Sequence, residues 1–141
     1  MQADRARLKR LQRLERVRAI AKQTAAVAAA EAEGTLAQLQ ALAQRTGRLA
    51  ADYAGRSDAD DGLALQQLTR FVGGLQGISA ATLGDAEQAR DLADRMLAEL
   101  AAAERRRAAV EHRASHEARK LAANAVPVSL TVRRGFGTGL E

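Results

Sequence analysis

The sequence predicts an all-α protein, a long antiparallel two-helix coiled-coil hairpin with a short acidic loop and an irregular C-terminal tail. Three observations predict this fold. The chain has 141 residues, enough for one domain, and it is rich in the helix formers Ala, Leu, Arg, Glu and Gln, with one proline. Bulky apolar residues are too few for a globular core, since Ala makes up much of the 47% hydrophobic content. Apolar residues also recur in alternating steps of three and four on both sides of a single turn.

The first expected helix covers about residues 3–54, and its apolar pattern has two halves. The later half follows the alternating rhythm of a coiled-coil seam: Ala28, Ala32, Thr35, Leu39, Leu42, Thr46, Leu49 and Tyr53. The earlier half runs closer to steps of three: Leu8, Leu11, Leu14, Val17, Ile20, Thr24 and Val27. We therefore expect the seam register to slip near the alanine-rich residues 25–32.

A polar segment, residues 55–62, holds two glycines and three acids and predicts a turn. Asp58, Asp60 or Asp61 can cap the helix that follows. A short carboxylate accepts hydrogen bonds from the unpaired N–H groups of the first turn and is favoured at the positive end of the helix dipole.

The second expected helix covers about residues 60–124 and carries one long seam. Its positions are Leu65, Leu68, Val72, Leu75, Ser79, Thr82, Ala86, Ala89, Ala93, Met96, Leu100, Ala103, Arg107, Val110, Ala114, Glu117 and Leu121. Gly73, Gly74 and Gly77 interrupt this helix, at a cost of about 1 kcal/mol each relative to Ala. They indicate either close helix packing, simple tolerance, or a bend that a partner selects.

The chain changes character near Pro127. Because proline disfavours a helical conformation at the residue before it, we expect the helix to stop near Asn124. Residues 125–141 are expected to form a flexible tail or, alternatively, a strand-forming segment that pairs with a partner. The domain organisation is then a hairpin over residues 1–124 followed by this tail.

A fold at residue 58 also predicts which residues face each other, because antiparallel partners then have numbers that add to about 117. The predicted neighbours are Leu49 with Leu68, Leu42 with Leu75, Ile20 with Leu97, and Val17 with Leu100. Large apolar residues would meet large ones, and alanines would meet alanines in the middle.

Charge is distributed unevenly along the chain, whose net charge is +5. Residues 1–22 hold eight Arg or Lys against two acids, and residues 104–120 hold six against three. Residues 23–103 hold six Arg against eleven acids. A hairpin brings the two basic segments together, so we expect one basic end and an acidic loop half. Unlike ends suit an adaptor between two different partners.

Several functional classes lack their residues. There is no cysteine, no apolar run long enough for a membrane span, and no apolar signal segment at the charged N-terminus, so we expect a cytoplasmic protein. His112 and His116 have a spacing compatible with two metal ligands but no clear third ligand, and no Gly-rich phosphate loop occurs. We expect no enzyme, no metal or other cofactor, and no small-molecule substrate.

Nucleic-acid binding is the main alternative, as a structural or nucleic-acid-associated basic coiled coil. The N-terminal cations could neutralise several phosphates. However, that segment has no aromatic residue for base stacking, and no familiar base-reading motif occurs. A membrane-surface helix is disfavoured by the same lack of aromatic residues.

The predicted hairpin resembles the flagellar export protein FliJ family, which is related to the stalk proteins of type III secretion. The resemblance covers about residues 8–121. It rests on Leu49 and Tyr53 in a Leu-x3-Tyr spacing, on the string from Phe71 to Ile78 after the turn, and on the basic block that begins at Glu104. Two glycines at 73 and 74, scarce aromatic residues and the tail depart from the family pattern.

The resemblance implies a non-enzymatic stalk that links the export ATPase ring to the export gate and assists the export of flagellar subunits. Such a protein would work in the cytoplasm at the inner-membrane export apparatus, with the ATPase hexamer, the cytoplasmic domain of the gate and export chaperones as partners. The gate would be contacted by Leu49, Tyr53, Phe71 and Leu75. Charge position alone suggests ring-facing residues: Arg7, Arg10, Arg13, Arg105 and Arg106. A two-helix rod buries little surface, so dimerisation is also compatible with this sequence.

Overall fold

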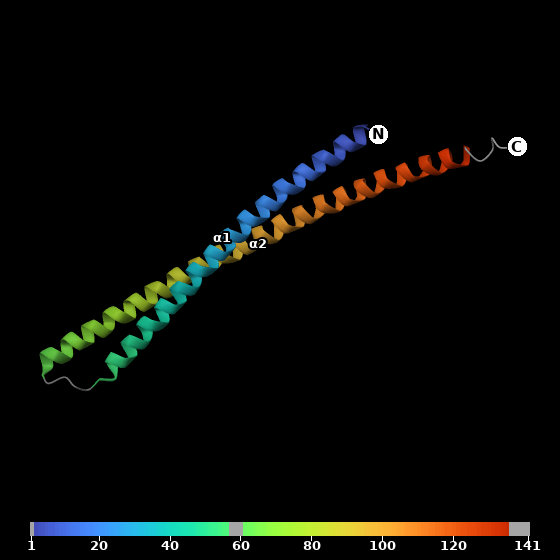
Figure 1. Ribbon diagram of the computed structural model, residues 1–141. Coiled ribbons are helices and arrows are strands. Elements are labelled where there is room, and N and C mark those ends of the chain that lie inside the picture. The colour runs from blue at the N-terminus through green and yellow to red at the C-terminus, as the bar shows by residue number, and fades with distance from the viewer. Residues whose placement is uncertain (1, 57–60, 136–141) are drawn as a thin grey trace. The chain divides into compact units, whose positions relative to one another are not determined.

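The computed structural model describes residues 2–56 and 61–135; of residues 126–135 it describes only the helical backbone. Two helices, α1 (Gln2–Ala54) and α2 (Gly62–Gly135), pack against each other in a hairpin (Figure 1), which confirms the predicted fold. The hairpin divides into two compact units. Unit 1 contains Met1–Ala25 and Leu100–Glu141, and unit 2 contains Ala26–Glu99. Unit 1 therefore holds both chain termini, and unit 2 holds the loop.

Asp61 caps the start of α2, as the sequence predicts. Its Oδ1 accepts a hydrogen bond of 2.6 Å from the backbone N–H of Ala64, and its carbonyl accepts one of 3.1 Å from the N–H of Leu65. The side chain thus satisfies a first-turn donor that has no partner within the helix. The other two expected caps, Asp58 and Asp60, lie outside the described residues.

The end of α2 differs from the expectation, because the helix continues past Pro127 to Gly135 instead of stopping near Asn124. An irregular conformation over residues 125–135 was therefore the wrong prediction. Proline removes one backbone hydrogen bond and disfavours, but does not forbid, a helical residue before it. Good helix formers precede Pro127, and no second proline follows it, so one local defect does not end the helix.

The seam of α1 keeps one register along the whole helix, so the slip expected near residues 25–32 does not occur. Buried and half-buried residues alternate in steps of three and four along the whole helix: Leu8, Leu11, Glu15, Arg18, Lys22, Ala25, Ala29, Ala32, Leu36, Leu39, Ala43, Thr46, Ala50 and Tyr53. A residue three positions on is rotated by only 300°, so a run of such steps moves off the face that meets α2. The expected seam residues Leu14, Val17 and Ile20 are consequently exposed, at 39%, 59% and 67%. In the later half, the expected seam residues Thr35, Leu42 and Leu49 are exposed as well, because Leu36, Ala43 and Ala50 take the positions that face α2.

The seam of α2 is confirmed over almost its full length. Every expected position from Leu68 to Leu121 is buried or half-buried, and Leu65 alone among the expected positions is exposed, at 55%. The strict alternation of three and four is what keeps this face turned toward α1.

The two helices are paired about one heptad away from the expected register. Within unit 1, Arg7 meets Glu117 and Lys22 meets Glu104. Within unit 2, Tyr53 meets Phe71. Folding at residue 58 would instead place Lys22 beside Arg95 and Tyr53 beside Ala64. The observed register replaces a repulsive pair with an attractive one and gives Tyr53 an aromatic partner.

Small residues form the core of unit 2. Ala43, Ala50 and Ala93 are only 3%, 3% and 2% exposed. The Ser79 hydroxyl on α2 donates a hydrogen bond of 3.1 Å to the carbonyl of Ala43 on α1. A Cβ placed on Gly47 would lie 3.4 Å from that hydroxyl oxygen. The backbones therefore come close enough at this level for a side chain to bond directly to the opposite helix.

The glycines at 73, 74 and 77 have a different environment. A Cβ added to any of them would meet nothing within 4 Å, and all three are exposed. Close helix packing therefore does not explain them, and α2 runs through them without a break.

Candidate partner-binding surfaces

Half-exposed ionic side chains lie along the helix contact of unit 1, beside the buried Val110 and Ala114. Arg107 donates to Glu104 through Nε and Nη2, both at 2.9 Å, and to Glu111 through Nη1 at 2.7 Å. The ammonium of Lys22 on α1 lies 2.9 Å from Oε2 of Glu104 on α2. The bidentate contact of Arg107 with Glu104 and its bond to Glu111 lie within α2, and the charge-assisted contact of Lys22 with Glu104 ties this network to α1.

The electrostatics of this network centre on Glu104. The hydrogen bonds from Arg107 and then Lys22 lower the pKa of its carboxyl from 4.5 to about 2. The hydrogen bonds to Glu104 and Glu111 raise the pKa of the Arg107 guanidinium. Both effects favour the charged forms, so the network stays ionised at neutral pH.

The surface of unit 1 is strongly cationic. By sequence the unit holds sixteen Arg and Lys against six Asp and Glu, which gives a net charge of +10. The three acids of its α2 segment, Glu104, Glu111 and Glu117, are all engaged by cations. Their charge is therefore compensated within the unit, and the remaining cations dominate the potential outside it.

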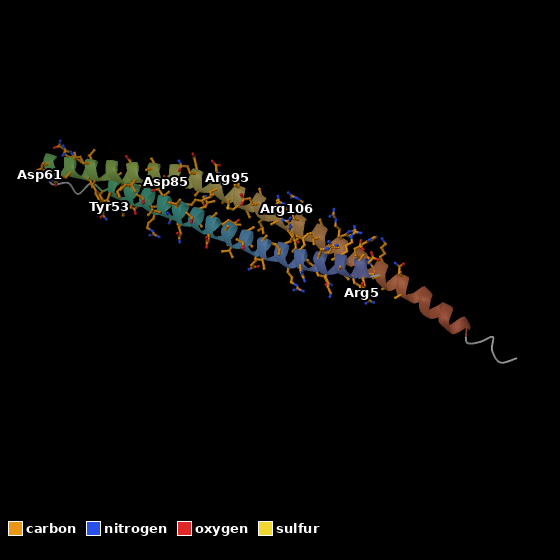
Figure 2. All side chains as sticks on the ribbon, turned by 90° about the horizontal axis from the view of Figure 1, so that it is seen from above. Arg5, Tyr53, Asp61, Asp85, Arg95 and Arg106 are labelled. Carbon is orange, nitrogen blue, oxygen red and sulfur yellow. The ribbon has the colours of Figure 1, made fainter. Side chains whose placement is uncertain are left out.

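The five arginines expected to contact a partner all lie on this surface. Arg10, Arg13, Arg105 and Arg106 are exposed. Arg7 is exposed as well, with one guanidinium nitrogen 3.9 Å from Glu117. In Figure 2, Arg5 on α1 and Arg106 on α2 mark the two helices that contribute to this surface. Unit 1 brings the arginines of both expected segments together.

A shallow depression on unit 1 contains both histidines, with Arg7, Leu11, Arg113 and Glu117 around them. Within the part of the chain that the structure describes, no three His, Cys, Asp or Glu side chains are grouped as metal ligands. The cationic neighbours of the histidines also oppose the binding of a cation.

The second candidate surface lies in unit 2, near the loop. The rings of Tyr53 and Phe71 meet edge to face, with centroids 5.0 Å apart and an interplanar angle of 80°. The guanidinium carbon of Arg56 lies 4.1 Å from the centroid of the Tyr53 ring. The site thus combines an aromatic pair with a cation–π contact, and the ring of Tyr53 takes part in both.

The four residues expected at this surface differ in their exposure. Phe71 and Leu49 are 48% and 42% exposed, so each presents much of its side chain to solvent. Tyr53 and Leu75 are half-buried seam residues and support the surface from within. The structure brings Tyr53 and Phe71 into direct contact.

The chain gives no match to any protein-family model, to any curated protein or to any solved structure in the three comparisons made. Among residues 2–56 and 61–135, neither helix has a stretch that is apolar enough to cross a membrane.

Two features of these surfaces were missed at the level of sequence. Arg56 follows the first helix and looks like an ordinary turn residue, so only the structure reveals its contact with Tyr53. The exposure of Leu14, Val17 and Ile20 was also missed. The alternation expected from Ala28 to Tyr53 gives no signal for it, because continued backwards it leads through Ala25 and Ala21 to Arg18 and Leu14.

Proposed function

We propose that the protein is a non-enzymatic component of a type III export apparatus such as that of the flagellum. In this proposal the hairpin links the export ATPase ring to the export gate in the cytoplasm, at the inner membrane, and assists the export of subunits. Unit 1 binds the ATPase through its cations, and unit 2 binds the gate through the surface around Phe71. The observation that carries the proposal is that one unit has a charge of +10, whereas the other has a charge of −5 and bears the exposed Phe71 packed against Tyr53.

The charge of unit 1 supports binding to an acidic partner. Exposed arginines on both helices attract an acidic rim over a distance of about one Debye length, about 8 Å at physiological salt. Arg10 and Arg13 on α1, with Arg105 and Arg106 on α2, are the residues proposed to make this contact.

The aromatic pair supports a localised contact on unit 2. An aromatic side chain held in place by its neighbours loses little rotational freedom on binding, which is typical of residues that dominate the binding energy of an interface. Phe71 is packed against Tyr53 on one edge and remains 48% exposed.

A binding measurement with the cytoplasmic domain of the gate tests this assignment. We expect Phe71→Ala to weaken binding at least tenfold, in line with the loss of an interface anchor, with the helical circular dichroism unchanged. Leu83→Ala is the matched control, because Leu83 lies on the same helix and is 54% exposed. Equal affinities of the wild type and Phe71→Ala would refute the gate contact.

The ATPase contact has its own test. Arg10→Glu combined with Arg13→Glu should abolish binding to the ATPase, and wild-type binding should weaken steeply as salt is raised. Arg95→Glu, on unit 2, serves as the control for a general change of charge. Binding that is indifferent to salt would contradict the proposed role of unit 1.

The second candidate function is that of a nucleic-acid-associated coiled coil, which the +10 charge of unit 1 specifically favours. No aromatic residue lies in residues 2–25 or 100–125, so such binding would depend on phosphates alone. A gel shift with duplex DNA at physiological salt separates the candidates. A retained complex that the ATPase does not displace would favour this second function.

A further inference from the structure

A second periodic stripe runs along α1 in unit 1, beside the seam. It consists of exposed residues in alternating steps of three and four, here called the α1 stripe: Arg7, Arg10, Leu14, Val17, Ala21 and Thr24. Leu14 and Val17 are 39% and 59% exposed. The spacing is that of a coiled-coil seam, yet no described part of unit 1 covers it.

The seam of unit 1 explains why these apolar residues remain outside. Glu15, Arg18 and Lys22 occupy the positions that face α2, and Lys22 is tied to Glu104 by its ionic contact. Turning Leu14 and Val17 inward would rotate the helix and remove that contact. The α1 stripe is therefore left available to a binding partner other than α2.

A matching stripe lies on α2 in unit 2, again exposed and again in alternating steps of three and four. This α2 stripe consists of Ile78, Ala81, Asp85, Gln88, Leu92, Arg95 and Glu99. Ile78 and Leu92 are 54% and 42% exposed. Asp85 and Arg95 can be located in Figure 2. The α2 stripe thus begins with two apolar residues and continues with polar residues on either side of Leu92. Like the α1 stripe, it combines apolar and charged side chains.

We propose that the α1 stripe of one copy packs on the α2 stripe of a second copy of this chain. Charge complementarity selects this occupant. Residues 5–22 carry eight Arg and Lys against one acid, whereas residues 85–99 carry five acids against two arginines. Two unit 1 surfaces would repel each other, so the contact joins unlike units. It goes beyond the proposed export function, because it needs no other protein.

An antiparallel arrangement that sets Val17 against Ile78 also matches the neighbouring positions of the two stripes. The steps of three and four coincide in this register and place Leu14 beside Ala81 and Arg10 beside Asp85. Two apolar layers are thus followed by a pair of opposite charges. A register shifted by two heptads, with Val17 against Leu92, would instead place Leu14 beside the charged Arg95.

The lengths of the stripes are compatible with this contact. The α1 stripe extends for about 25 Å and the α2 stripe for about 32 Å, at a rise of 1.5 Å per residue. An anionic lipid surface suits the α1 stripe less well, since residues 2–25 contain no Trp, Tyr or Phe to sit at a membrane interface. A second copy of the chain is therefore the occupant that fits both the charge and the apolar residues.

Sedimentation equilibrium of the full chain over a range of concentrations tests the proposal. We expect a mass that rises above the 15.0 kDa of one chain as concentration increases, and a weaker association at high salt. Val17→Glu and Ile78→Glu should each leave a monomer. Val27→Glu and Leu83→Glu are the controls. They are 50% and 54% exposed, lie off the stripes, and should associate like the wild type.

A mixing experiment identifies the pairing directly. The Val17→Glu chain keeps an intact α2 stripe, and the Ile78→Glu chain keeps an intact α1 stripe. Each alone should be monomeric, but their mixture should associate through the one pair of stripes that remains intact. Circular dichroism of each variant confirms that the helices are retained.

Three results would overturn the proposal. One is a monomeric wild type at every concentration, and another is a mixture that stays monomeric. The third is binding of the monomer to vesicles rich in phosphatidylserine that Val17→Glu abolishes, which would assign the α1 stripe to a lipid surface. None of these measurements involves an export protein, so they leave the proposed function to its own tests.

Discussion

Lys22 on α1 and Glu104 on α2 form an ion pair of 2.9 Å that selects the register of the two helices in unit 1. The alanines of the neighbouring unit 2 seam do not define a register by shape, because alanines along a helix are nearly equivalent. A shift of one heptad toward the loop would place Lys22 beside Leu97 and remove the ion pair. The ionic seam thus contributes specificity to a pairing that packing alone leaves loosely defined.

The pH dependence of stability should reflect Glu104. Its pKa is lowered from 4.5 to about 2 in the folded protein, so its contribution is present above pH 4.5 and is lost as the pH falls toward 2. We expect Tm, followed by circular dichroism, to fall over this window, and to fall less steeply for Glu104→Gln. The control is Glu99→Gln. Identical pH profiles for the wild type and Glu104→Gln would contradict this role.

Alanine at the exposed glycines of α2 should stabilise the protein. A Cβ at Gly73, Gly74 or Gly77 meets nothing within 4 Å, so each substitution should raise the free energy of unfolding by about 1 kcal/mol. Urea titration measures the gain. Gly47→Ala is the comparison, because its Cβ would lie 3.4 Å from the Ser79 hydroxyl, and its gain should be smaller. A loss of stability at all three positions would show that the glycines have a structural role.

A larger side chain at Ala43 should destabilise unit 2. Ala43 is 3% exposed and its carbonyl accepts the hydrogen bond from Ser79, so Ala43→Leu must push the helices apart. We expect a cost of about 1–3 kcal/mol in urea unfolding. Ala41→Leu, at an exposed position two residues earlier, should cost little. Similar costs for the two variants would mean that the helices are not in close contact at Ala43.

Loss of the cap should weaken the start of α2. Asp61→Ala removes the 2.6 Å bond to the N–H of Ala64, and we expect it to lower the free energy of unfolding by about 1 kcal/mol. Asp61→Asn, which can still accept the bond, should retain most of the stability. Amide hydrogen exchange at Ala64 would report the change locally, with faster exchange in Asp61→Ala. Unchanged exchange there would contradict the capping role.

The sequence predicts the hairpin, the turn and nearly the whole seam of α2, because strict three-and-four periodicity constrains which face of a helix is buried. It fails for much of the seam of α1, where expected positions in both halves, among them Leu14 and Leu42, are exposed. In the first half of α1 the apolar residues follow steps of three, and hydrophobicity alone predicts that these residues are buried. The structure follows the geometric period and places Glu15, Arg18 and Lys22 in the seam. Their long aliphatic stems make this arrangement tolerable, and Lys22 is paired with Glu104.

For the candidate surfaces, the sequence predicts the segments but not the contacts. The neighbours Tyr53 and Phe71 depend on the register, and the register depends on ionic pairs such as Lys22 with Glu104. A helical pattern repeats every seven residues, so two registers one heptad apart bury the same faces. Periodicity cannot distinguish them, whereas a few specific pairs can.

The contrast between the ionic seam of unit 1 and the alanine seam of unit 2 implies that dissolved ions act on the two parts differently. Concentrated sodium chloride screens the Lys22–Glu104–Arg107 network and leaves methyl groups packed as before. High salt should therefore weaken the pairing of the two helices in unit 1 more than in unit 2. The hairpin would then open from unit 1 while the helices of unit 2 remain packed.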